Sequence, residues 1–168
     1  MTATTILFKT LQLSYPLAIL ILALLYYRKP IFLPMKFYMS MTFRPEARRL
    51  FAIVVAMMVL LYNFSFTRTE PFSLWHLPGL LYGLLLLHGK FTSATLSWLH
   101  SDRILQGFAF ALIMFSMITP KLFPLSVSFA ITFAAALLYP SRKLLLMAEH
   151  PNDYQAFLGN ENDIRQHY

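Results

Sequence analysis

Five stretches of this 168-residue sequence contain no Asp, Glu, Lys or Arg, and each is 17 to 20 residues long. An α-helix needs about 20 apolar residues to cross the roughly 30 Å hydrocarbon core of a bilayer. The sequence therefore predicts an all-α integral membrane protein with about five transmembrane helices. The five predicted spans are 10–27, 50–67, 71–89, 104–120 and 122–141.

The composition agrees with a membrane protein and excludes several other classes. Hydrophobic residues make up 58% of the chain and charged residues 12%, whereas ordinary soluble domains contain about 25% charged residues. The net charge of +7 is accounted for by positive cytoplasmic loops and anionic lipid headgroups, so no nucleic-acid partner is expected. Cysteine is absent, which excludes disulfides and thiol catalysis. No cofactor is expected.

The positions of the basic residues predict the orientation in the membrane. Six of them lie between the first two predicted spans, and exporting so many positive charges in one short loop is unfavourable. We therefore expect the N-terminus outside and the C-terminus in the cytoplasm, with residues 1–147 as the transmembrane domain and 148–168 as a polar cytoplasmic tail. The compact chain and the lack of targeting signals favour the bacterial inner (plasma) membrane.

The same six basic residues are the best candidates for a binding surface. The loop around them is apolar and aromatic, which suits the headgroup zone of a membrane, although a groove for a partner protein could use the same surface. We predict that they bind anionic lipid headgroups or another protein subunit. They are Arg28, Lys29, Lys36, Arg44, Arg48 and Arg49.

Two local patterns predict the start of one helix and the position of another relative to the membrane. Pro45 followed by Glu46 is typical of a helix start, because proline needs no hydrogen-bond partner there and a carboxylate favours the positive end of the helix dipole. The stretch Phe91–His100 is free of charge but only ten residues long. Because a stretch of that length cannot cross the bilayer, it is expected to be a helix lying on the membrane surface.

Close helix packing in membranes uses small residues, and polar side chains can join helices by hydrogen bonds. The candidates for close packing are the pairs Ser93/Ser97 and Ala130/Ala134. The few polar residues within the predicted spans are expected to fix which helices pair. They are Gln12, Ser14, Asn63, Gln106, Ser116 and Thr132.

Ionisable residues within predicted spans would mark ion pathways or catalysis, and here only His76 and His88 qualify. Twelve residues separate them, about 18 Å along a helix, so they cannot share a metal ion. No metal site is therefore predicted, and transport driven by protons or sodium is not favoured. The expected role of both histidines is structural, at the membrane interface.

The residues around these histidines also allow an enzymatic alternative. The stretch with Trp75-His76, Tyr82-Gly83 and His88-Gly89 resembles the Trp-His, Trp-Gly and His-Gly stretch of membrane-bound O-acyltransferases. This resemblance implies a catalytic base for acyl transfer at His76. It covers less than a tenth of the chain, Leu77 stands where the family has glycine, and those enzymes have about twice as many spans.

Three classes of function fit the sequence. The favoured class is a non-catalytic multi-pass subunit that anchors, scaffolds or regulates a larger membrane assembly. The first alternative is a small membrane factor that associates with copies of itself, of the defence, exclusion or immunity type, and could form a pore. The third is an acyl- or lipid-modifying enzyme that uses His76. We expect the chain not to be an enzyme.

Overall fold

The structure, a computed structural model, describes residues 35–69 and 74–148 and four single positions, Thr10, Ser14, Ala18 and Ile21. The described part is helical apart from short turns and contains no strand, which confirms the predicted all-α class. Most of the predicted span 10–27 and the tail from residue 149 onward lie outside the described residues.

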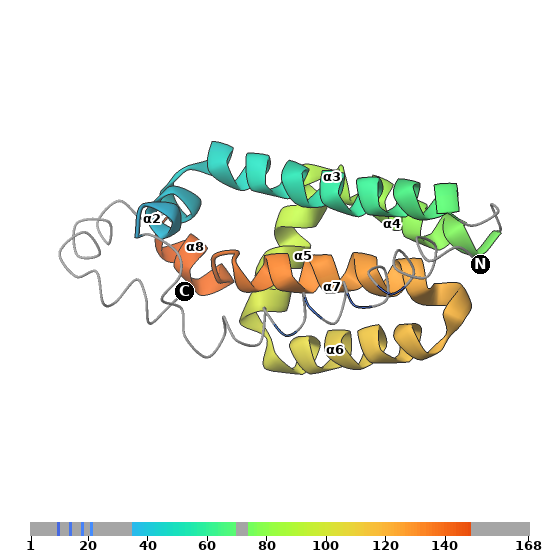
Figure 1. Cartoon of the computed structure of the whole chain (residues 1–168). Coiled ribbons are helices and arrows are strands. Elements are labelled where there is room, and N and C mark those ends of the chain that lie inside the picture. The colour runs from blue at the N-terminus through green and yellow to red at the C-terminus, as the bar shows by residue number, and fades with distance from the viewer. Residues whose placement is uncertain are drawn as a thin grey trace.

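Three helices, α3, α6 and α7, run along a common axis, and α5 runs across that axis on the side where α2 and α8 lie (Figure 1). Helix α7 is central: it contacts α3, α4, α5 and α6, and 12 of its 15 residues are buried. The elements, in chain order, are α2 (Met35–Phe43), α3 (Pro45–Thr69), the 3-10 turn η1 (Leu74–His76), α4 (Leu77–Leu86), α5 (Gly89–Ser101), α6 (Arg103–Ile118), the 3-10 turn η2 (Pro120–Leu122), α7 (Phe123–Leu137) and α8 (Arg142–Ala148).

Within the described ranges, α3 alone is long and apolar enough to cross a membrane as one straight helix, over Pro45–Phe66. The pair α5 and α6 would pass the same test as one unit, but the two helices are bent by 106°. The predicted spans 71–89, 104–120 and 122–141 correspond to α4, α6 and α7. These three are helical as predicted but have only 10, 16 and 15 residues, or about 15 to 24 Å.

The helix boundaries follow from proline and from one aspartate. Helix α3 begins at Pro45 with Glu46 in its first turn, which confirms the predicted start. Helix α7 ends at Leu137, three residues before Pro140, because the residue preceding a proline avoids the helical conformation. Residues 138–141, the last four of the predicted span 122–141, are therefore not helical and separate α7 from α8. Asp102 caps α6 by accepting hydrogen bonds from the first backbone N–H groups of that helix.

The segment 91–100 forms most of α5, which confirms a helix there. Its buried face, which includes Thr92, Leu96 and Leu99, packs against α3 and α7. Its outer face exposes Phe91 and Trp98. The helix turns sharply into α6 at Asp102, whose backbone is extended.

Helix α4 packs on α3 through Gly79 and Gly83, both buried. A Cβ atom built on Gly79 would lie 2.2 Å from Oδ1 of Asn63, and one built on Gly83 would lie 2.7 Å from Leu60. The two glycines are four residues apart and form the small-xxx-small pattern of close helix contacts. This pair was not among the predicted close contacts, which were Ser93/Ser97 and Ala130/Ala134.

Three of the polar side chains within predicted spans join helices, as expected. Nε2 of Gln106 on α6 donates to the His100 carbonyl on α5 at 2.8 Å. Nδ2 of Asn63 on α3 donates to Oγ of Ser128 on α7 at 2.8 Å. The hydroxyl of Tyr82 on α4 donates to Oγ1 of Thr132 on α7 at 3.1 Å. Ser116 differs, because its hydroxyl donates to the Leu112 carbonyl of its own helix.

Candidate functional site

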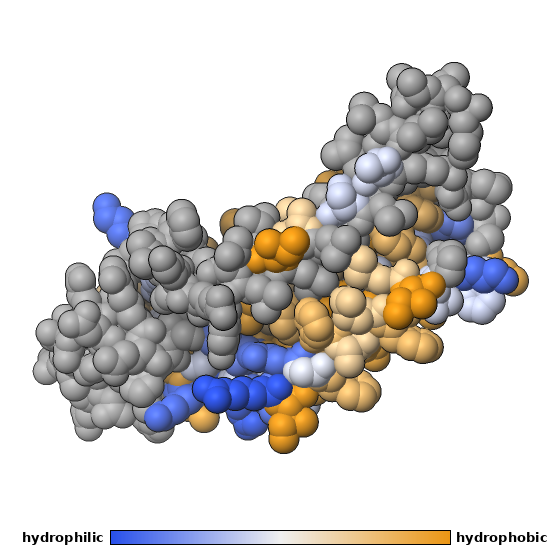
Figure 2. Space-filling view, turned by 60° about the horizontal axis from the view of Figure 1, so that its bottom comes forward, coloured by the Kyte–Doolittle hydropathy of each residue, from blue (hydrophilic) through white to orange (hydrophobic). Residues whose placement is uncertain are grey.

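Basic residues gather at one end of the described structure. The elements that carry them lie together, since α2 contacts α3 and α8, and α8 contacts α5. Figure 2 shows one group of hydrophilic residues at its lower left, a second at its right edge and a largely hydrophobic surface between them. Of the nine basic side chains that the structure describes, only Lys121 lies elsewhere, in η2. The eight at this end are Lys36, Arg44, Arg48, Arg49, Lys90, Arg103, Arg142 and Lys143.

A groove of about 540 Å³ lies within this basic end, which we call the basic groove. One wall comes from the first three turns of α3 and the other from the turn between α4 and α5. Two segments far apart in the sequence therefore meet there. The residues that line the basic groove are Pro45, Arg48, Arg49, Ile53, Leu87, His88, Gly89, Lys90 and Ser93.

The cations of the basic groove differ in how they are held. Arg48 is half-buried, and its guanidinium donates to the backbone carbonyl of Thr42 at 2.7 Å and to that of Met41 at 3.3 Å. It therefore ties the end of α2 to the start of α3. Arg49 and Lys90 are exposed. No acidic side chain lines the groove, so its cations have no carboxylate partner within it.

A partly buried hydrogen bond supports the α5 side of the groove. The hydroxyl groups of Ser93 and Tyr139 are 2.7 Å apart. Tyr139 is completely buried, and the centroid of its ring lies 6.1 Å from the ring centroid of Phe51 on α3. This single side chain thus contacts both helices that form the walls of the groove.

The predicted binding residues are only partly brought together. Of the six, Arg48 and Arg49 line the basic groove, whereas Lys36 and Arg44 lie on α2 and at the α2–α3 junction outside it. Arg28 and Lys29 lie outside the described residues. Lys90 and His88 line the groove and were not among the predicted binding residues. Their position at the end of a predicted span, on the same expected side of the membrane as Arg48, was the available signal.

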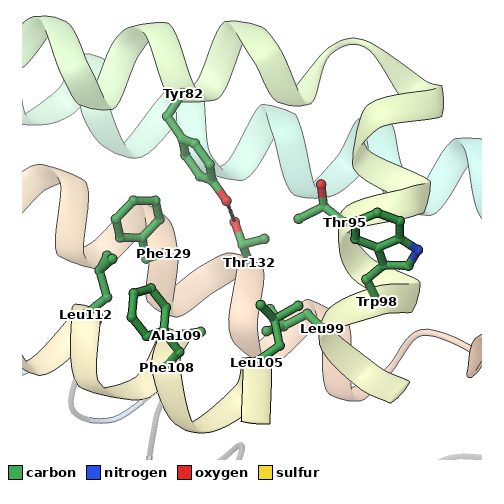
Figure 3. Close-up of a pocket in the computed structure, with 10 residues that line it drawn as sticks. All are labelled: Tyr82, Thr95, Trp98, Leu99, Leu105, Phe108, Ala109, Leu112, Phe129 and Thr132. Atoms are coloured by element: carbon green, nitrogen blue, oxygen red, sulfur yellow. Dashed lines mark hydrogen bonds between the residues drawn. The ribbon is translucent and has the colours of Figure 1, made fainter. Parts of the chain in front are cut away.

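A second cavity, of about 250 Å³, lies between α4, α5, α6 and α7 (Figure 3). Its walls are almost entirely apolar and aromatic, and the hydrogen-bonded pair Tyr82 and Thr132 is its main polar feature. Trp98 and Phe108 at its edge are exposed, so the cavity opens on the side of the helices. The remaining lining residues are Thr95, Leu99, Leu105, Ala109, Leu112 and Phe129.

The two histidines lie at opposite ends of α4 and in different surroundings. His76 is buried, and the centroid of its ring lies 5.6 Å from that of Phe66. It lines neither of the two cavities described above. His88 is exposed and lines the basic groove. Across the described ranges, no group of three or more His, Cys, Asp or Glu side chains could hold a metal ion.

The lining of the basic groove combines cations with the apolar side chains of Ile53 and Leu87. Comparisons with protein-family models, with curated proteins and with solved structures found no match to this chain.

Proposed function

We propose that this chain is a multi-pass membrane protein that acts as a non-catalytic subunit of a larger membrane assembly. In this proposal five helical segments lie in the bilayer, the N-terminus faces outward, and the basic end faces the cytoplasm. The observation that supports it best is the continuous apolar outer face of α3 between Leu50 and Phe64, a stretch that contains no charged residue.

Helix α3 exposes one large apolar side chain after another along its outer face. In water such a face would be unfavourable, because contiguous exposed apolar patches of this extent are rare on soluble monomers. Lipid tails or apolar partner helices would cover it without that cost. The exposed residues are Leu50, Ile53, Val54, Met57, Met58, Leu61 and Phe64.

The basic end suits the cytoplasmic headgroup region. Positive side chains are enriched on the cytoplasmic side of membranes and attract anionic lipids. Helix α5 runs across the other helices at this end and exposes Lys90, Phe91 and Trp98. Aromatic and basic side chains are typical of helices that lie at the membrane interface. This position is compatible with the predicted surface helix.

The orientation can be tested directly, because the chain contains no cysteine and any introduced thiol is unique. Lys143→Cys and Lys121→Cys place single exposed thiols on α8 and η2. We expect a membrane-impermeant maleimide to label the first only from the cytoplasmic face and the second only from the outer face. Labelling of both from one face would contradict the proposed topology.

The subunit role is tested by mild detergent extraction with a C-terminal affinity tag. We expect the chain to stay in the membrane after an alkaline wash and to purify with a second protein in fixed stoichiometry. A homogeneous multimer of this chain alone would favour the self-associating membrane factor instead. A monomer without a partner would contradict both.

A further inference from the structure

The basic groove combines cations that suit a phosphate. Arg49 and Lys90 project from different helices into one space of about 540 Å³, and Arg48 adds a third positive charge between them and α2. Guanidinium groups match the geometry of phosphate oxygens, and a lysine ammonium adds a compact charge. Since no carboxylate lines the groove, an anionic ligand would balance these charges.

The groove also has an apolar side, which a free phosphate ion would not contact. Ile53 and Leu87 line it. Met57 lies one helical turn from Ile53 on α3, and Leu84 lies about one turn before Leu87 on α4. All four side chains are exposed. Because α3 and α4 contact each other, these residues continue the groove as an apolar strip away from the basic end.

A ligand that fits both parts has an anionic phosphate joined to a hydrocarbon chain. We propose that the basic groove binds the headgroup of one anionic phospholipid, with the phosphate between Arg49 and Lys90 and an acyl chain along the strip. This inference rests on the membrane location proposed above, since it places the strip in the hydrocarbon layer and the cations at the headgroup level.

The test uses the full-length chain purified in mild detergent and native mass spectrometry. The probes are phosphatidylglycerol and phosphatidylcholine with identical acyl chains, and inorganic phosphate as the free anion. We expect one phosphatidylglycerol per chain, retained at least tenfold more strongly than phosphatidylcholine. Millimolar inorganic phosphate should not displace it, because phosphate lacks the contacts with the strip.

The decisive variant is R49A/K90A, which removes the two exposed cations of the groove. Each basic residue near an anionic membrane contributes about 1 kcal/mol, so the Kd for phosphatidylglycerol should rise about 30-fold. The matched control is R142A/K143A, which removes two exposed positive charges of α8 at the same end but outside the groove. It should change the Kd less than threefold.

Three results would overturn the lipid site. They are equal loss of lipid in both double variants, equal retention of the two phospholipids, and displacement of the lipid by millimolar inorganic phosphate. Failure of the proposed function is separately visible, because a chain released from membranes by an alkaline wash would contradict the membrane location itself. A chain that stays in the membrane but shows no lipid preference would contradict the site alone.

Discussion

Replacing Gly79 by alanine is expected to destabilise the protein by about 2 kcal/mol. A Cβ at this position would lie 2.2 Å from Oδ1 of Asn63, a distance that real atoms do not tolerate. Inserting atoms into a packed contact costs about 1–3 kcal/mol. The Asn63 amide must also move away, which threatens its hydrogen bond to Ser128 on α7. The free energy of unfolding in micelles, followed by tryptophan fluorescence, measures this loss.

Two further glycines give matched controls for the same substitution. Gly107→Ala on α6 meets nothing within 4 Å of the new Cβ, so it should be neutral or stabilising by up to about 1 kcal/mol, the helix propensity gain. Gly83→Ala should lie between the two, because the contact at 2.7 Å is with the flexible end of Leu60. Equal effects at all three positions would show that Gly79 is not a packing contact.

The proposed clash can be isolated by removing its partner. Asn63→Ala deletes the amide that the new Cβ would meet, at the cost of the hydrogen bonds of Asn63 to Val59 and Ser128. In the double variant N63A/G79A, the second substitution should therefore cost less than it does alone, by about 1–2 kcal/mol. Additive losses would contradict the contact between α3 and α4 at this point.

Tyr139→Ala is expected to have the largest effect of any substitution considered, about 3–5 kcal/mol of unfolding free energy. Tyr139 is completely buried between α3 and α5, and truncating a buried aromatic residue leaves a cavity. Because its ring packs on Phe51 of α3 and its hydroxyl is hydrogen-bonded to Ser93 of α5, ligand binding in the basic groove should weaken as well. Thermal unfolding in micelles measures the first effect and lipid retention the second.

Tyr139→Phe separates the hydroxyl group from the ring. It keeps the ring beside Phe51 and removes only the hydrogen bond to Ser93, which should cost about 0.5–1.5 kcal/mol. Ser93→Ala removes the same hydrogen bond from the other side and should cost a similar amount. A phenylalanine variant as unstable as the alanine variant would show that the ring packing contributes little.

The sequence predicted part of the basic groove but not all of it. Arg48 and Arg49 were identified from charge alone, because basic residues that flank an apolar run are visible in the sequence. The sequence does not show which of six basic residues share a groove, and Lys36 and Arg44 proved to lie outside it. Lys90 was missed because its approach to Arg49 depends on the contact of α5 with α3, which joins residues about forty positions apart.

The sequence by itself determined the helical class, the start of α3 at Pro45 and a helix over 91–100, because apolar runs, proline and charge act on neighbouring residues along the chain. Only the tertiary structure decided that Gly79 faces Asn63, that α5 turns by 106° into α6, and that Arg49 and Lys90 share one groove. Those features depend on which helix faces meet, and a face is selected by the packing of distant segments rather than by the residues beside it.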